Sequence, residues 1–282
     1  MEIRIAITGA SGFVGTNLRA FLNDERIHFT SITRRKTRRL KFEKNIVSDL
    51  GQKDLPGRLR GCAALVHLIG IGAQTKDADY QSVNVDLTKK AVSLCKKSGI
   101  KKIIYVSGLG VGNNTTFGYF LSKLKAEEEI KKSGLDYTIL RASYVIGRDD
   151  PLTKNLRKQA RSGSILIPGD GAYRLQPILV QDVAKVILAC VTNKKLSKKT
   201  VDLVGPQTVS FARFARRFAR NENVKIRKVS LQRAYFTALN RPDDAAFGLD
   251  DLNIMVGDFT GNHKRLERLC GFRLNSTGLL PL

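Results

Sequence analysis

Two residues with the chemistry for proton transfer, Tyr119 and Lys123, stand four positions apart in the chain. In a helix this spacing places both side chains on one face. A neighbouring ammonium favours the tyrosinate, which lets a phenol with an ordinary pKa of about 10 act as a base near neutral pH. The pair therefore predicts proton exchange with a substrate oxygen. Ser107 has two interpretations: its hydroxyl either takes part in this chemistry or caps the end of a strand.

A glycine-rich turn, residues 8–15 with the sequence TGASGFVG, lies between an apolar strand pattern and a helical pattern. In this context Gly9 permits a tight turn, Gly12 lets the backbone approach a pyrophosphate, and Gly15 lets the helix pack closely on the strand. Phosphate groups would bind the free N–H groups at the positive end of the helix. The alternative is a turn without a ligand. The residues predicted to contact a dinucleotide here are Gly9, Ser11, Gly12, Phe13, Val14 and Gly15.

The end of the second predicted strand bears on which dinucleotide binds. Proteins selective for NAD usually carry an Asp or Glu there, which binds the adenosine ribose. This chain has Thr33, Arg34, Arg35 and Lys36 instead. Arginine binds phosphate in bidentate fashion, so Arg34 and Arg35 predict a preference for NADP(H), with NAD(H) as the other cofactor considered. The alternative is that both arginines belong to a generally basic surface.

Apolar strand patterns alternate with helical patterns through the first half of the chain. The strands are expected at residues 3–7, 27–33, 46–47, 64–69, 102–107 and 137–141, and the helices at 13–22, 79–98 and 119–132. Strands that alternate with helices of this length predict right-handed βαβ units. We therefore predict an α/β fold over residues 1–149, a doubly wound parallel sheet of the Rossmann type with strand order 3-2-1-4-5-6.

Residues 150–282 are predicted to form mainly a smaller α/β lobe, interleaved with the core sheet, that supplies a substrate pocket. Helices are expected at residues 150–162 and 181–192, and a strand at 200–204. Ser210 is expected to cap an amphipathic helix, and a core-facing helix is favoured over one on a membrane surface. Its apolar face carries Phe211, Phe214, Ala215 and Phe218, and its basic face carries Arg213, Arg216, Arg217 and Arg220.

The composition excludes several classes of protein. Of the 282 residues, 42% are hydrophobic and 4 are cysteines, which argues against disordered, collagen-like and disulfide-rich proteins. The cysteines lie far apart without a C-x-x-C pair, and neither a membrane span nor a signal peptide is recognised. No metal site is predicted. We therefore expect a soluble protein with free thiols in a reducing compartment, the cytoplasm.

The formal net charge is +24, from 49 Lys and Arg against 25 Asp and Glu. The basic residues are scattered in clusters along the chain, and no zinc-finger, basic-zipper or RNA-binding aromatic motif accompanies them. A specific nucleic-acid partner is therefore disfavoured, and a generally basic surface is favoured. Weak association with anionic membrane surfaces, or with a larger complex, stays open.

The chain resembles an atypical or extended short-chain dehydrogenase/reductase of the epimerase-like group. Within that group it is most similar to the proteins related to the nucleotide-binding accessory subunit of respiratory complex I. The resemblance covers nearly the whole chain and is strongest up to about residue 215. It rests on residues 8–15, Arg34, Asp49, 83–85, 105–110, 119–123, 140–147, 176–184 and 203–206.

The resemblance implies cofactor contacts beyond the glycine-rich turn. Asp49 corresponds to the residue that short-chain reductases place near the adenine, and Lys123 to the lysine that holds the nicotinamide ribose. The end of the fourth strand borders the cofactor in this fold, whereas His67 is expected to be a packed strand residue. The residues assigned to the cofactor in this way are Asp49, Leu50, Leu68, Ile69, Gly70, Asn84, Lys123 and Ala142.

The chain also departs from the family pattern. Relatives usually carry a second Ser or Thr after the fifth strand, whereas here Ser107 is followed by Gly108. Leu179 stands where relatives often have His, and Ala142 replaces a frequent Pro. Three hypotheses follow: a reductase or epimerase acting on a carbonyl or sugar-nucleotide substrate, a non-catalytic NADP(H)-binding scaffold, and an RNA- or membrane-associated protein. The Tyr119–Lys123 pair favours the first.

Overall fold

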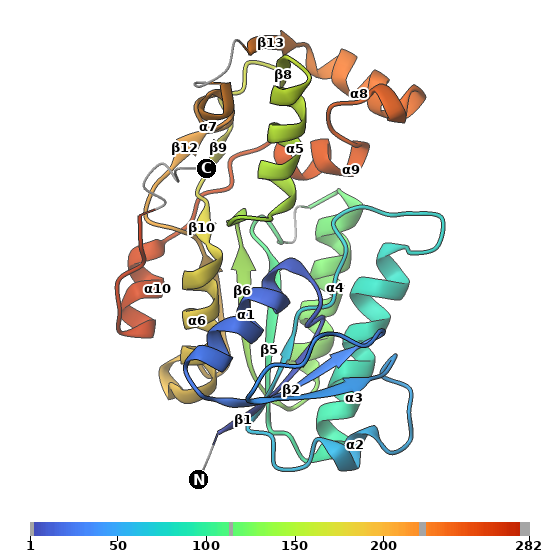
Figure 1. Cartoon of the computed structure of the whole chain (residues 1–282), viewed down its shortest axis with the longest axis vertical. Helices are drawn as coiled ribbons and strands as arrows, with labels where there is room; N and C mark the ends of the chain where they lie inside the picture. Colours follow the sequence, from blue (N-terminus) through green and yellow to red (C-terminus); the bar gives the residue numbers. More distant parts are fainter. Residues whose placement is uncertain (1–2, 113–114, 220–223, 277–282) are drawn as a thin grey trace.

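A seven-stranded sheet forms the centre of the molecule (Figure 1). The computed structural model describes residues 3–112, 115–219 and 224–276. The strand order is β11-β6-β5-β4-β1-β2-β3, and every neighbouring pair is parallel. The predicted order of the first six strands is confirmed, and β11 extends the sheet beside β6. The strands are β1 (Arg4–Thr8), β2 (His28–Thr33), β3 (Glu43–Val47), β4 (Ala64–His67), β5 (Lys102–Gly108), β6 (Asp136–Ala142) and β11 (Lys199–Leu203).

Helices cover both faces of this sheet, and Figure 1 shows α1 and α6 on one side with α3 and α4 on the other. Alternate strand residues therefore enter different apolar clusters: Ile5 and Ile7 pack towards α1 and α6, whereas Ala6 packs towards α3 and α4. Each fully buried aliphatic side chain contributes about 1.5–3 kcal/mol. The helices are α1 (Phe13–Asp24), α2 (Leu55–Arg58), α3 (Leu87–Ser98), α4 (Gly118–Lys132) and α6 (Val180–Thr192).

A smaller lobe lies beyond the carboxyl ends of the strands and has an apolar cluster of its own (Figure 1). Its first helix begins where Asp150 accepts the Thr153 N–H at 2.8 Å, as the sequence predicts for an N-cap. Its helices are α5 (Pro151–Arg161), α7 (Phe211–Ala215), α8 (Leu231–Asn240) and α9 (Leu249–Met255). The last helix, α10 (His263–Cys270), packs instead beside α6 and β11 on the core sheet. Two-stranded sheets pair β8 (Ser164–Pro168) with β13 (Lys225–Val229), β9 (Arg174–Leu175) with β12 (Val209–Ser210), and β7 (Val145–Ile146) with β10 (Ile178–Leu179).

Two helical segments differ from the sequence-based expectation. The helix expected over residues 79–98 begins as a π-helical turn, η1 (Gln81–Asp86), before α3. The helix after Ser210 has only five α-helical residues and continues as a 3₁₀ turn, η3 (Arg216–Ala219). Its apolar residues Phe211 and Phe214 are buried in the lobe cluster, so the core-facing orientation is confirmed. Arg220 lies outside the described residues.

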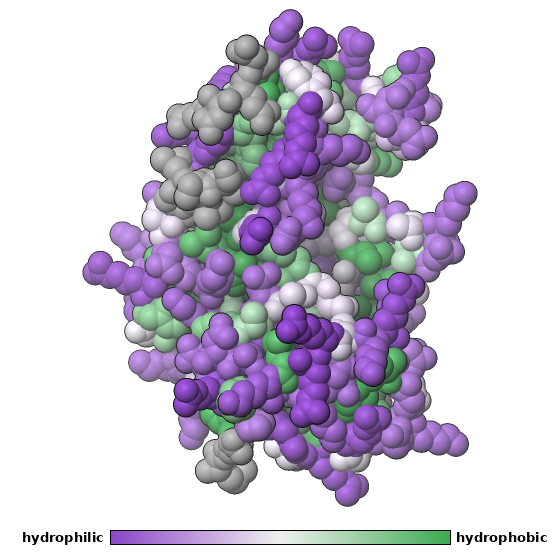
Figure 2. Space-filling model, in the orientation of Figure 1, coloured by the Kyte–Doolittle hydropathy of each residue, from purple (hydrophilic) through white to green (hydrophobic). Residues whose placement is uncertain are grey.

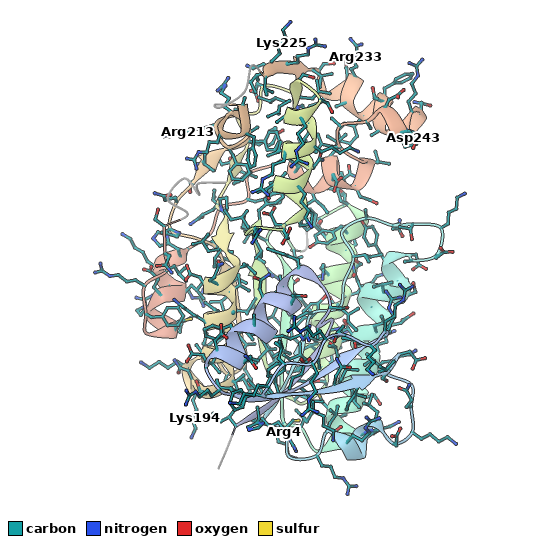
Figure 3. The ribbon with its side chains drawn as sticks, viewed as in Figure 1. Arg4, Lys194, Arg213, Lys225, Arg233 and Asp243 are labelled. Atoms are coloured by element: carbon teal, nitrogen blue, oxygen red, sulfur yellow. The ribbon has the colours of Figure 1, made fainter. Side chains whose placement is uncertain are left out.

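Charged side chains are spread over the surface rather than gathered on one face. Lys194 lies at the lower end of the view in Figure 3, Arg213 at the upper left, and Lys225 and Arg233 at the top. Hydrophilic residues cover most of the face seen in Figure 2. No helix within the described ranges is long and apolar enough to cross a membrane. The four cysteines are free thiols, as predicted.

Candidate functional site

The glycine-rich turn lies at the carboxyl end of β1, and two of its glycines are required by close packing. Gly9 has φ +70°, and a Cβ there would lie 2.7 Å from the carbonyl carbon of Leu68. A Cβ on Gly15 would lie 2.3 Å from the carbonyl oxygen of Gly9. No side chain fits at either distance. Gly9 and Gly15 therefore let the turn pass close to β4 and let α1 pack on β1.

Gly12 is different, because its Cα faces open space. A Cβ there would meet only the carbonyl oxygen of Gly9, at 3.4 Å. Gly12 is the N-cap of α1, has no side-chain cap, and is followed by a first turn without acidic residues. The N–H groups at this helix end are therefore left for an external anion. This cradle fits the pyrophosphate of a dinucleotide.

A cleft of about 470 Å³ opens beside the turn, between the sheet and the lobe. From the turn, Gly9, Gly12, Phe13, Val14 and Gly15 line it, whereas Ser11 is exposed and does not. From the strand ends, Leu68, Gly70 and Ala142 line it, whereas the half-buried Ile69 and the buried Asn84 do not. The cleft is completed by residues of α5, α9 and the segments around them, among them Leu152, Phe247, Ile254 and Phe259.

Tyr119 and Lys123 lie one turn apart on α4, as the spacing predicts. Tyr119 is half-buried and lines the cleft. Lys123 is buried, with its Nζ 5.0 Å from the centre of the Tyr105 ring and 5.9 Å from that of Tyr119. Its Nζ also lies 2.7 Å from where a Cβ on Gly70 would be. Glycine at this position therefore leaves room for the ammonium.

Burial shifts the pKa values of this pair in opposite directions. Loss of solvation raises the pKa of Tyr119 to about 12. Loss of solvation also lowers the pKa of Lys123 to about 8, although the Glu127 carboxylate opposes the shift. The lowered phenol pKa expected from the sequence is therefore not found here, because the ammonium lies over the ring and desolvation dominates. At neutral pH Tyr119 is a protonated phenol, suited to donating a proton.

The buried ammonium gives a testable effect on stability. We expect Lys123→Met to raise the free energy of unfolding at pH 7 by roughly 3 kcal/mol, since each unit of pKa shift corresponds to about 1.4 kcal/mol. Between pH 8 and 10.5 Lys123 is protonated in the unfolded chain but has lost its proton in the folded chain. The free energy of unfolding of the wild type therefore rises with pH, and the difference from Lys123→Met becomes smaller. Urea unfolding of both proteins at about pH 7 and pH 10 measures this. An equal gap at the two pH values would contradict it.

Ser107 and Gly108 end β5 near the tyrosine. The hydroxyl of Ser107 is buried without a hydrogen-bond partner among the described residues. At Gly108 a Cβ would lie 2.9 Å from Cε1 and 3.0 Å from the hydroxyl of Tyr119. The Tyr119 ring thus occupies the space that a second Ser or Thr hydroxyl would need. Any side chain at residue 108 would therefore force the Tyr119 ring to move.

His67 lies in a buried hydrogen-bonded row on one side of β4. The Thr8 hydroxyl is 2.7 Å from His67 Nδ1, and the Thr88 hydroxyl is 3.1 Å from His67 Nε2. Thr88 donates its own proton to the Asn84 carbonyl at 2.7 Å, so it accepts from Nε2. Burial, with a smaller contribution from Lys123, lowers the pKa of His67 to about 3. His67 is therefore a neutral packed residue, as predicted, and not a catalyst.

The same row continues from Asn84 to α4. The Asn84 side chain accepts the Ile71 N–H at 2.9 Å and donates to the Ser122 hydroxyl at 2.9 Å. Ser122 donates in turn to the Tyr119 carbonyl at 2.7 Å. Asn84 therefore positions α4 and the loop after β4. The hydrogen-bonding roles of Thr8, Thr88 and Ser122 could not be predicted from the sequence, because single hydroxyl residues carry no spacing signal for such a row.

The predicted adenosine contacts lie at the ends of β2 and β3. Residue 32 of β2 pairs with Thr8 of β1, which places the end of β2 beside the glycine-rich turn. Arg34 and Arg35 follow it and are exposed, outside the lining of the cleft. Asp49 is also exposed and accepts the Gly51 N–H at 2.8 Å; Leu50 next to it is half-buried with φ 72°. These side chains are free to meet a ligand that extends along this edge.

Comparison with known proteins agrees with this geometry. A family model described as NAD(P)H-binding matches residues 9–194. An uncharacterized sugar epimerase of Bacillus subtilis, YhfK, is 24% identical over 218 residues, which cover 73% of this chain and 96% of that protein. Subunit 9 of the NADH dehydrogenase 1 alpha subcomplex of Arabidopsis thaliana is 29% identical over 148 residues, 50% of this chain but 36% of that protein.

The solved structure of UDP-glucuronic acid 4-epimerase from Bacillus cereus, in complex with UDP-glucuronic acid and NAD, has the same fold. Its TM-score is 0.77 at 16% identity, with 98% of this chain and 96% of that chain covered. The glycine-rich turn, the sheet order and these matches lead to one conclusion. The chain belongs to the NAD(P)H-binding family and has the fold of the atypical, epimerase-like short-chain dehydrogenases/reductases.

Proposed function

We propose that this chain is an NADP(H)-dependent reductase or epimerase that acts on a carbonyl or a sugar carbon. The observation that carries the proposal is that Tyr119 lines the same cleft as the phosphate cradle formed by Gly9, Gly12 and Gly15. A nicotinamide cofactor, when bound, supplies or accepts the hydride. The names of the epimerase relatives support this class of reaction.

The roles of the residues follow from their positions. The N–H groups at the start of α1 hold the pyrophosphate. Lys123, whose Nζ lies next to Gly70, holds the nicotinamide ribose. Tyr119 exchanges a proton with the substrate oxygen. Because the pKa of Tyr119 is held at about 12, the phenol donates its proton readily only to a strongly basic oxygen. Such an oxygen develops when a carbonyl takes up hydride, so the protonated phenol is the form that this step requires.

Deuteride transfer tests the proposal directly. The protein is incubated with NADPH labelled at the transferable position and with a panel of ketones, aldehydes and nucleotide sugars. We expect deuterium on a substrate carbon, detected by mass spectrometry, together with oxidation of the cofactor. Bound cofactor without transfer to any member of the panel would contradict the catalytic proposal.

A non-catalytic scaffold that binds NADP(H) is the second candidate. One observation favours it: the Tyr119 ring fills the space where a second hydroxyl at residue 108 would polarise the substrate oxygen. Loss of a comparable oxyanion donor costs about 2.7–4 kcal/mol in other enzymes. The match to a subunit of a respiratory complex supports the same candidate. Cofactor bound in stoichiometric amount, with no transfer in the assay above, is the result expected of a scaffold.

The proposed preference for NADP(H) predicts a measurable effect of Arg34 and Arg35. We expect the wild type to bind NADPH more tightly than NADH, and replacement of both arginines by Ser to reduce that preference by roughly ten- to a hundredfold. The reason is that a charge-assisted contact to the 2′-phosphate is worth about 1.5–3 kcal/mol. Fluorescence titration with both cofactors measures it. The double substitution of Arg38 and Arg39 by Ser, in the same basic run, controls for general charge.

Equal affinity of the wild type for the two cofactors would contradict the preference. An equal loss of the NADPH preference in the Arg34/Arg35 and Arg38/Arg39 variants would assign the effect to long-range charge and not to direct contact. Both double substitutions change the net charge by the same amount.

A further inference from the structure

The lobe side of the cleft is mainly apolar, with Asp150, Asn155 and Asp251 as its polar residues. Leu152, Phe247, Ile254 and Met255 line it from the lobe, in and around α5 and α9. Phe120 of α4 stacks on Phe259 with ring centres 5.8 Å apart and planes at 24°, and both rings line the cleft. A ligand that reaches beyond Tyr119 therefore meets hydrocarbon and aromatic surface.

No cationic side chain is present among the described residues that line the cleft, although the chain has 49 Lys and Arg. The charged residues there are two aspartates. Asp150 is engaged as a cap: its Oδ1 accepts the Thr153 N–H and its Oδ2 accepts the Gly147 N–H at 3.1 Å. Asp251 is exposed, and its carboxylate accepts the Gly248 N–H at 3.2 Å. The charged groups on the lobe side of the lining, away from the glycine-rich turn, therefore repel an anion.

The one buried ammonium near the tyrosine is already engaged. Lys123 lies behind the lining, over the Tyr105 ring and 3.4 Å from the Val106 carbonyl, where it serves the cofactor in the proposed function. Among the uncharged polar groups of the lining, the Asn155 amide donates to the Ala246 carbonyl at 2.9 Å, whereas the Ser143 hydroxyl has no partner among the described residues and suits a single neutral oxygen. A diphosphate placed on the lobe side would lose its hydration without gaining an ion pair, which costs several kcal/mol.

We infer that the substrate is an uncharged carbonyl compound, or the corresponding alcohol, with a large apolar body, and that nucleoside-diphosphate sugars are not substrates. This inference rests on the proposed oxidoreductase function and narrows its substrate class. The oxygen of such a substrate lies at Tyr119, and its hydrocarbon body lies against Phe259, Ile254 and the side chains beside them. Burial of each methylene tightens binding roughly fourfold, which provides affinity without any ion pair.

Binding to the protein saturated with NADP⁺ tests the inference. The probes are decanone, an uncharged ketone with an apolar chain, and UDP-glucose, each titrated by calorimetry. We expect decanone to bind and UDP-glucose to give no measurable binding. Tighter binding of UDP-glucose, or binding of neither probe, would overturn the inference. A protein that does not bind NADP⁺ would instead remove the proposed function and this inference with it.

Two variants of α9 locate the binding surface. Ile254→Asp places a carboxylate inside the cleft, and we expect decanone affinity to fall at least about tenfold because an unpaired charge meets the hydrocarbon chain. Leu249→Asp makes the same change on the same helix outside the lining, and it should leave decanone affinity unchanged. Ile254→Ser serves if Ile254→Asp fails to fold. Unchanged affinity in the folded Ile254 variant would overturn the assignment of this surface.

Discussion

Tyr119→Phe is expected to slow deuteride transfer by about 10²- to 10⁴-fold, the contribution typical of a positioned proton donor. NADPH affinity should stay nearly unchanged. The phenyl ring keeps its edge contacts with Tyr80 and Phe120, whose ring centres lie 6.2 Å and 5.1 Å away, so the local packing survives. Single-turnover measurement with labelled NADPH separates the two quantities, because binding is complete before transfer begins.

Tyr80→Phe is the matched control for this prediction. It removes the same atom from a neighbouring tyrosine whose hydroxyl donates to the Gly72 carbonyl at 2.7 Å and is not part of the cleft lining. We expect a loss of about 1 kcal/mol in stability and little change in the transfer rate. Transfer by Tyr119→Phe at the wild-type rate would rule out Tyr119 as the proton donor. A similar fall in the transfer rate in Tyr119→Phe and Tyr80→Phe would show that disturbed packing, and not loss of a proton donor, causes the effect.

Gly12→Val is expected to lower NADPH affinity by at least about a hundredfold while the protein stays folded. The new Cβ meets only one atom, at 3.4 Å, and the backbone at Gly12 has φ −75°, which any residue adopts. The two γ-methyl groups, however, project towards the space assigned to the pyrophosphate. Losing two charge-assisted hydrogen bonds of about 1.5–3 kcal/mol each gives this effect. Calorimetric titration with NADPH measures it.

Gly15→Ala provides the contrast, because the added Cβ clashes with the protein's own backbone and not with a bound ligand. Its Cβ would lie 2.3 Å from the Gly9 carbonyl oxygen, so α1 must move away from β1. We expect a clear fall in the melting temperature of the unliganded protein, whereas Gly12→Val should melt close to the wild type. Wild-type NADPH affinity in Gly12→Val would refute the phosphate cradle.

Local spacing determined the central part of the fold. Ile5 and Ile7 alternate before the Gly9–Gly15 turn, and the period of the next helix differs from that of the strand, so a βαβ start could be predicted. Each later strand repeats this change of period, which predicts further βα units. The strand order 3-2-1-4-5-6 came from the Rossmann type that the glycine-rich turn indicates. The pair of Tyr119 and Lys123 could likewise be placed on one face of a helix, because that relation depends only on residues four apart.

Tertiary structure alone decided the electrostatics of the pair. The spacing of Tyr119 and Lys123 says that they are neighbours, but not that both lose solvation or that the ammonium lies over the Tyr105 ring. Desolvation depends on atoms contributed by distant segments, so the direction of the Tyr119 pKa shift could not be predicted locally. The row of hydroxyl and amide groups through His67 is invisible in the sequence for the same reason.

The character of the cleft also became apparent only in three dimensions. Its lobe side combines Phe120 with Leu152, Phe247 and Phe259, which are distant from one another in the chain and share no periodic pattern. The sequence determined that the chain carries a large excess of Lys and Arg, and this excess by itself suggested anionic ligands. Folding leaves the described lining of the cleft without a cationic side chain, because long charged side chains keep their heads in water while apolar residues fill the space between sheet and lobe.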